Sequence, residues 1–395
     1  MRLHLIRLGS GLVALALMAG APRALAEDKA ALPASTADAM AQMSPAVAEY
    51  RRKLADYQAA RAEFDAVAVP YWTSITEKRR GRNAKRRDRQ QITLDDYVLT
   101  HPPLYTGPKR PVDPEPEDDG KPKERKAIPV VSDLLQAAAQ EFQFTPQRPT
   151  SEMEFKRAYA RYALASGLTR EQAVRVYSFE TGGTGNYDVQ AGIEHGGKRA
   201  ISTAMGYNQL LTTNSVELMA EQGPEFVKEL TAKVAASSGP ARKTLEHKLA
   251  VLKKMVAFTL TVPDDWSAHE KLANTAKGWA VHAMVLDIDV GPMLQTHKLL
   301  TSVLFARAKG YNRPLTAAEL EMMNLTGDGT GLDMVTMPQA MREQVPTSNF
   351  FQRSGYERNP VAIRHNTVAK LLAVTDERMD VNSSKPGAKE MAAAF

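Results

Sequence analysis

A glutamate followed by a glycine-rich turn is the strongest candidate for chemistry in this sequence. Residues 169–180 have the spacing of a short amphipathic helix, which opens with Thr169 and Gln172 and ends at Glu180. The negative end of the helix dipole disfavours an ionised acid there. A partly buried Glu180 would therefore keep a proton near neutral pH, as a general acid for glycosidic bonds must. The alternative is an exposed glutamate that merely ends a helix.

A second segment, Gly206-Tyr207-Asn208-Gln209, returns the chain 26 residues after Glu180 and leads into another helix. We expect this segment to lie opposite the carboxylate. The alternative for Tyr207 and Gln209 is ordinary packing within a loop.

Two stretches, Ser178-Phe179-Glu180-Thr181 and Gly206 to Leu211, resemble the lysozyme-like lytic transglycosylases. That family has a catalytic glutamate at a helix end, usually followed by serine, and later a Gly-Leu-Met-Gln segment before a further helix. A third family element is an Asn-Ala-Gly loop preceded by tyrosine. Its counterpart here is Asn324-Leu325-Thr326-Gly327, with Met323 in place of the tyrosine. The resemblance covers roughly residues 150–335.

The resemblance implies a mainly α-helical, lysozyme-like domain that cleaves peptidoglycan glycan strands without a cofactor. Glu180 would protonate the oxygen bridging N-acetylmuramic acid and N-acetylglucosamine. It would then deprotonate the muramic 6-hydroxyl, which closes a 1,6-anhydro ring. The substrate's acetamido group would replace the second carboxylate of ordinary glycosidases. The residues implied to bind substrate are Thr181, Tyr187, Gly206, Tyr207, Asn208, Gln209 and Asn324.

The departures from the family pattern leave other functions open. The chain could be a lysozyme-fold protein that binds or organises glycan without cleaving it, or a glycosidase for another polysaccharide. Asp188 is the nearest second acid, and facing Glu180 it could hold the water of an inverting hydrolase. The alternative for Asp188 is a loop-capping aspartate. The eight histidines lack metal-ligand spacing, so we predict no metal site.

The N-terminus has the pattern of a secretory signal peptide over residues 1–26. Arg2 and Arg7 precede an apolar stretch at 8–20, and Ala-Leu-Ala at 24–26 fits a cleavage site. That stretch is too short to span a bilayer, and no later one is long enough. The absence of cysteine fits an oxidising compartment. With the family resemblance, this predicts a periplasmic protein without an integral membrane segment.

Composition divides the rest of the chain into four further parts. We expect an N-terminal helical region at 27–100, a linker rich in proline and charge at 101–130, the catalytic domain at 131–375, and a flexible tail at 376–395. A dense basic run at 78–89 could contact an anionic surface or polymer, or could be a solvated helix face. Without the predicted leader, 48 basic side chains stand against 45 acidic ones, and this net charge of +3 is too small to argue for nucleic acid. The lack of aromatic residues within the run weakens that function further.

Caps and apolar periodicity predict a succession of helices and no sheet. A first helix begins at Ser44-Pro45 and should end before Pro70, and Gly223-Pro224 should end the helix that opens near Thr213. A helical hairpin is expected over 225–258 with its turn at 237–240. Further helices are expected at 151–163, 267–285, 290–309 and 316–323.

Overall fold

The computed structural model of the chain describes residues 44–115, 127–193 and 199–395. Within these ranges the protein is mainly α-helical, with 16 α-helices and no strand. This confirms the predicted fold class at the level of mainly α. The predicted signal peptide and part of the predicted linker lie outside the described residues. No helix in the described ranges is long and apolar enough to cross a membrane.

The α-helices follow one another along the chain, and the longest segments between them are 88–130 and 181–211. They are α2 (Pro45–Arg87), α3 (Val131–Phe142), α4 (Glu152–Ala165), α5 (Arg170–Glu180), α6 (Thr212–Ala235), α7 (Gly239–Thr259), α8 (Trp266–Ala273), α9 (Ala276–His282), α10 (Gly291–Ala308), α11 (Ala317–Thr326), α12 (Asp328–Thr336), α13 (Gln339–Arg342), α14 (Arg353–Glu357), α15 (Pro360–Arg364), α16 (Val368–Ser383) and α17 (Pro386–Ala394). Three short 3₁₀ helices, η1 (Leu94–Asp96), η3 (Ala283–Leu286) and η4 (Thr347–Phe350), lie between them.

The chain divides into two compact units, and their boundary differs from the predicted one. The first unit is Met1–Ala68 with Pro103–Lys123, and the second is Val69–Pro102 with Glu124–Phe395. In the first unit, Tyr105 from the proline-rich segment packs edge-on against Phe64 of α2 at 5.3 Å. Part of the predicted linker therefore contacts the helix.

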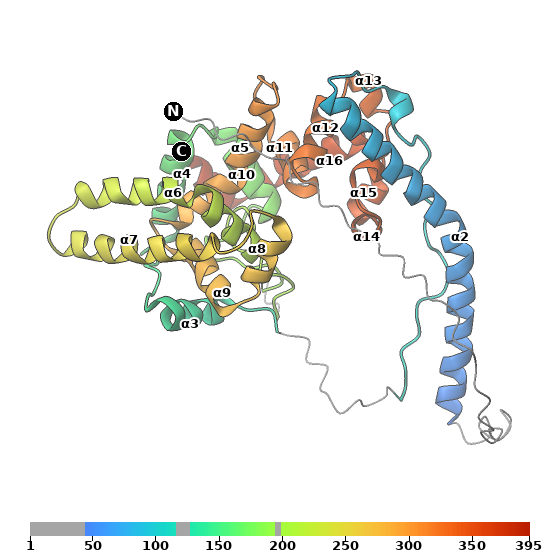
Figure 1. Cartoon of the computed structure of the whole chain (residues 1–395), viewed down its shortest axis with the longest axis horizontal. Helices are drawn as coiled ribbons and strands as arrows, with labels where there is room; N and C mark the ends of the chain where they lie inside the picture. Colours follow the sequence, from blue (N-terminus) through green and yellow to red (C-terminus); the bar gives the residue numbers. More distant parts are fainter. Residues whose placement is uncertain (1–43, 116–126, 194–198) are drawn as a thin grey trace, which may run out of the picture. The chain divides into compact units, whose positions relative to one another are not determined.

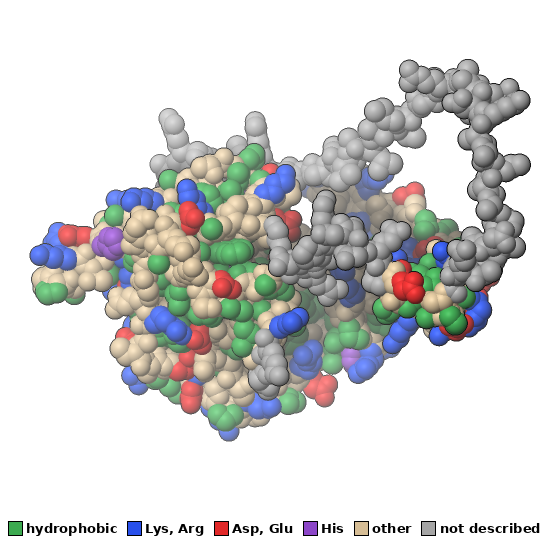
Figure 2. Space-filling model, turned by 90° about the horizontal axis from the view of Figure 1, so that it is seen from below, with side chains coloured by type: hydrophobic (Ala, Val, Ile, Leu, Met, Phe, Trp, Pro, Cys, Tyr) green, Lys and Arg blue, Asp and Glu red, His purple; other side chains and the backbone are tan. Residues whose placement is uncertain are grey.

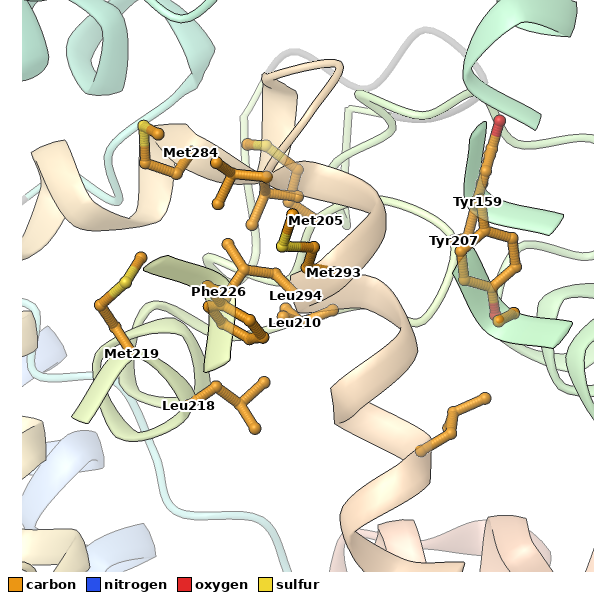
Figure 3. Close-up of a cluster of buried hydrophobic side chains, with 14 of the residues drawn as sticks. Tyr159, Met205, Tyr207, Leu210, Leu218, Met219, Phe226, Met284, Met293 and Leu294 are labelled. Carbon is orange, nitrogen blue, oxygen red and sulfur yellow. The ribbon is translucent and has the colours of Figure 1, made fainter. Parts of the chain in front are cut away.

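The second unit holds the main core and the candidate site. Helix α5 packs against α4, α11, α16 and α17, while α10 packs against α4, α6, α11 and α12. Helices α6 and α7 form the helical hairpin that the sequence predicts, and they run side by side in Figure 1. A large cluster of buried Leu, Val, Met and aromatic side chains fills the space between these helices, part of which Figure 3 shows.

Two predicted helix ends are wrong, because proline and glycine lie inside longer helices. Helix α2 continues through Pro70, and α6 continues through Gly223-Pro224. A Cβ atom at Gly223 would lie 2.5 Å from Cγ2 of Val256 in α7. Gly223 therefore allows the two helices of the hairpin to approach closely, rather than ending α6.

Most of the basic run at 78–89 forms the C-terminal part of α2, and part of it is buried within the second unit. Arg82 is 1% exposed and donates through Nε to Asp333 Oδ2 at 3.2 Å, while its guanidinium lies 4.3 Å from the ring centre of Tyr97. Arg86 also pairs with Asp333. A wholly solvated helix face is thus wrong for this run. On the face shown in Figure 2, basic and acidic side chains are interspersed over the larger body of the molecule.

The C-terminal segment 376–395, predicted as a flexible tail, is helical and packed. It comprises the end of α16 and the whole of α17. Ala388 and Met391 are fully buried, and the amide of Ala388 donates to the carbonyl of Gly183 at 3.0 Å. Helix α17 therefore supports the turn that follows Glu180.

Candidate active site

Glu180 is the last residue of helix α5, as the sequence predicts. Thr169 accepts a hydrogen bond from the amide of Gln172 at 3.1 Å, and the side chain of Gln172 accepts one from the amide of Thr169 at 3.0 Å. This capping box fixes the first turn of the helix. Val176 and Tyr177 are fully buried, so one face of α5 is held in the core and its final residue, Glu180, is half-buried at the helix C-terminus.

The side chain of Asn324 contacts Glu180 directly. Its side-chain amide Nδ2 donates to Oε1 of Glu180 at 3.0 Å, across 144 residues of chain. The amide comes from the last turn of α11, which packs against α5. Two residues that the sequence singles out by separate motifs are therefore in contact, and Asn324 fixes one oxygen of the carboxylate.

A second carboxyl group, Glu321, lies beside this pair. It precedes Asn324 by three residues in α11, so both side chains occupy one face of the helix. Glu321 is fully buried. Burial, and then the charge of Glu180, raise its pKa well above the ordinary value, although Asn324 and Lys298 act in the opposite direction.

Lys298 of α10 is the cation that this acidic group faces. Burial lowers its pKa, while the charges of Glu180, Glu321, Glu217 and Asp328 oppose that effect. Asp328, the first residue of α12, accepts a hydrogen bond from Ser302 at 2.5 Å. Several carboxyl groups therefore interact electrostatically with one ammonium group, a combination that is common at sites of proton transfer.

Glu221, one turn after Glu217 in α6, is a further acid that interacts with these carboxyl groups. Desolvation of its carboxyl group, followed by the charges of Glu217, Asp264 and Asp328, raises its pKa to about 7, although the residue as a whole is exposed. The folded protein therefore holds a proton that the unfolded chain releases near its ordinary pKa of 4.5. Stability from this group is fully present below the unfolded value and is lost as the pH rises through about 7.

We therefore expect Glu221→Gln to raise the melting temperature relative to the parent at about pH 8, and to change it little at about pH 4. Thermal unfolding at both pH values measures the difference. Glu229→Gln, an exposed change on the same helix, is the matched control and should be neutral at both. Equal effects of Glu221→Gln at the two pH values would contradict the expected pH dependence.

The structure places Tyr207 in the core rather than on a cleft wall. Its ring is fully buried and lies 5.5 Å from that of Tyr159 and 5.2 Å from that of Tyr177. Figure 3 shows the side chains of Tyr159 and Tyr207 next to each other. Its hydroxyl donates to Glu152 at 2.6 Å. These contacts favour the packing alternative over stacking on a sugar ring.

The neighbouring residues of the return segment are also engaged internally. Asn208 is fully buried, and its side-chain amide donates to the carbonyl of Gln295 at 2.7 Å. Gly206 has φ +78°, and a Cβ atom there would lie 2.0 Å from Nε2 of Gln295. Gln209 folds back to donate to the carbonyl of Gly206 at 2.9 Å. Gly206–Gln209 is thus a tight turn that anchors α10, the helix that carries Lys298.

The predicted residues close to Glu180 in sequence have local partners too. The Thr181 hydroxyl donates to the carbonyl of Tyr177 at 2.8 Å. Tyr187 accepts from Arg148 at 2.7 Å, and Arg148 also forms an ion pair with Asp188. An Asp188 paired with Arg148 fits the loop alternative better than a water-holding acid.

A pocket of about 630 Å³ adjoins the loop after Glu180. It is lined by Val130, Val131, Ser132, Thr184, Gly185, Asn186, Asp188, Val189, Gln190 and Ile193. Glu180 does not line this pocket. Glu180 and this pocket are therefore separate features, although the same loop follows Glu180 and lines the pocket.

Sequence reasoning missed Glu321, Lys298 and Glu217. One signal was present: Glu321 interrupts the apolar sequence of α11, where Leu320, Met322 and Met323 are buried. An acid in such a helix is either paired or functional. Lys298 similarly interrupts the largely buried helix α10.

The comparisons with known proteins do not add to this picture, since no protein-family model, curated protein or solved structure matches the chain. Among the described residues, no group of three or more His, Asp or Glu side chains is arranged to hold a metal ion.

Proposed function

We propose that the chain is an exported, periplasmic lytic transglycosylase of lysozyme-like fold, with Glu180 as its general acid and base. The hydrogen bond of 3.0 Å between Asn324 and Glu180 carries the proposal. It joins the first and third elements of the motif resemblance. A half-buried carboxyl group at a helix C-terminus, oriented by a fixed amide donor, is suited to proton transfer.

The proposed reaction needs one carboxyl group acting twice. Glu180 donates its proton to the oxygen that bridges N-acetylmuramic acid and N-acetylglucosamine, and the glycosidic bond breaks. The acetamido group of the substrate stabilises the developing positive charge. The ionised Glu180 then takes the proton of the muramic 6-hydroxyl, whose oxygen bonds to the anomeric carbon. Asn324 holds one oxygen of Glu180, which orients the carboxyl group for both proton transfers.

The engagement of Asp188 with Arg148 supports a transglycosylase over an inverting hydrolase. An inverting hydrolase needs a second carboxylate that holds water on the opposite face of the sugar. Asp188 is the predicted candidate, and its carboxylate is paired with Arg148. Capture of the 6-hydroxyl of the substrate requires no such group.

Product mass tests the proposed reaction. Purified protein incubated with isolated sacculi should release soluble muropeptides that end in 1,6-anhydro sugars, each one water lighter than the hydrolysis product. Mass spectrometry of the released material measures this directly. Products with a reducing end would instead identify a hydrolase, and release from chitin alone would identify another substrate.

A second candidate function is glycan binding without cleavage. The burial of Tyr207 and Asn208 favours it over cleavage, because the segment expected to hold substrate opposite Glu180 is then part of the core. In that case the protein would sediment with sacculi and would release no soluble fragments.

A further inference from the structure

Glu321 is a buried acid that the single-glutamate reaction does not use. It is fully buried, and neither of its oxygens makes a hydrogen bond of ordinary geometry within the described part of the chain. Its position on α11 is fixed, because Asn324 on the same face is bonded to Glu180. A buried carboxylate without such bonds is costly, so this group must either hold a proton or share one.

The charged groups around Glu321 come from several helices. Glu180 faces it from α5 and Lys298 from α10. The charges of Glu217 of α6 and Asp328 of α12 also act on Lys298. Helix α16 also packs against α11, but it directs Asp376 and Asp380 to Arg175, and Arg378 to the ring of Phe179 at 4.8 Å.

We propose that Glu180 and Glu321 hold one proton between them, and that Glu321 is a positioning residue acting through Glu180. Two buried carboxyl groups in mutual reach cannot both ionise readily, and one ammonium group offsets one negative charge. With Lys298 charged, a pair that keeps a single proton leaves the three groups without net charge. The full burial of Glu321 and the half-burial of Glu180 place that proton mainly on Glu321 at rest.

The raised pKa of Glu321 agrees with this arrangement. Burial is its largest cause and the charge of Glu180 the next. Because the two groups interact, the titration belongs to the pair rather than to either residue.

The shared proton gives Glu321 a part in the reaction, and this part rests on the proposed function. The single proton passes from Glu321 to Glu180, and Glu180 gives it to the bridging oxygen as the glycosidic bond breaks, which leaves both carboxyl groups ionised beside Lys298. Glu180 then takes the proton of the 6-hydroxyl, and this proton returns to Glu321. The pair begins and ends with one proton, one glycosidic bond breaks, and one bond from oxygen 6 to the anomeric carbon forms.

The variant Glu321→Gln tests the pair through the pH profile of cleavage. The amide keeps the size of the side chain but removes its acid. Glu180 alone beside Lys298 then loses its proton at a lower pH than the pair does. We expect the basic limb of kcat/KM to move by about one pH unit towards acid, which lowers activity near neutrality about tenfold and restores it at lower pH. Glu229→Gln, an exposed change on α6, should keep the parent profile.

A second readout does not depend on activity. Carbon-13 NMR of labelled glutamate carboxyl groups should show two signals that titrate together, of which one is absent in Glu321→Gln and the other in Glu180→Gln. Independent titrations, or an unmoved pH profile in a folded Glu321→Gln, would overturn the shared proton. A parent without cleavage activity would refute the proposed function, while the NMR titration would still decide whether the proton is shared.

Discussion

Replacing Glu180 with glutamine should abolish most cleavage of peptidoglycan while leaving the protein folded. General acid and base steps typically contribute about 10²–10⁴-fold to rate, and here one group would supply both. Glutamine retains a carbonyl oxygen that can accept the hydrogen bond from Asn324. We therefore expect a loss of about 10²-fold or more in the rate of muropeptide release, with an unchanged circular dichroism spectrum.

Glu171→Gln is the matched control for this loss. Glu171 lies on the same helix, is exposed, and forms a surface ion pair with Arg175 at 3.4 Å. Exposed pairs of this kind are worth at most about 1 kcal/mol, so the control should keep both activity and stability. If Glu180→Gln released muropeptides as fast as the parent, the assignment of Glu180 as the acid would be wrong.

The local elements of the fold could be predicted because their causes are local. Thr169 and Gln172 form a capping box in the sequence and in the structure, and Ser151 caps α4, accepting from the amide of Glu154 at 3.2 Å. Such caps depend on residues three apart, which a sequence displays. Helix α5 and its terminal Glu180 were therefore within reach of prediction.

The errors occurred where distant packing overrides a local signal. Gly223-Pro224 is a strong stop signal, yet Val256 of α7 requires the glycine for close approach. The alanine-rich C-terminus resembles a loose tail, yet Met391 is fully buried. In both cases the deciding contact lies in a different helix, which composition does not reveal.

In the candidate site, too, local sequence motifs could be predicted and contacts between distant helices could not. Asn324 could be found because it belongs to a motif, and it does contact Glu180. Glu321 and Lys298 belong to no motif, and their significance comes from the meeting of α5, α10 and α11. Tyr207 shows the converse, since a motif position predicted to face substrate is filled by a core side chain. Spacing identifies candidate residues, but tertiary packing decides which of them share a site.

Removing the charge of Lys248 should cost more stability than most single substitutions in this chain. Lys248 of α7 is fully buried and donates to Asp287 Oδ1 at 2.9 Å and to Asp289. Burial raises the pKa of Asp287, whereas at Asp289 the charges of Lys248 and Lys233 outweigh burial and lower the pKa. Breaking a buried ion pair from one side typically costs about 3–5 kcal/mol. We expect this loss in the free energy of unfolding of Lys248→Met, measured in urea at neutral pH.

The loss arises because Asp287 and Asp289 then lack the ammonium group of Lys248. A second substitution tests this cause. Asp289→Asn in the Lys248→Met background removes one of the two charges, so the double variant should be more stable than the single one. Lys253→Met, exposed on the same helix, should change stability by about 0.5 kcal/mol or less. A Lys248→Met protein as stable as the parent would mean that the aspartates do not need the ammonium group. Because the aspartates lie directly before α10, the same loss should disturb the placement of Lys298 and lower cleavage activity below the unfolding transition.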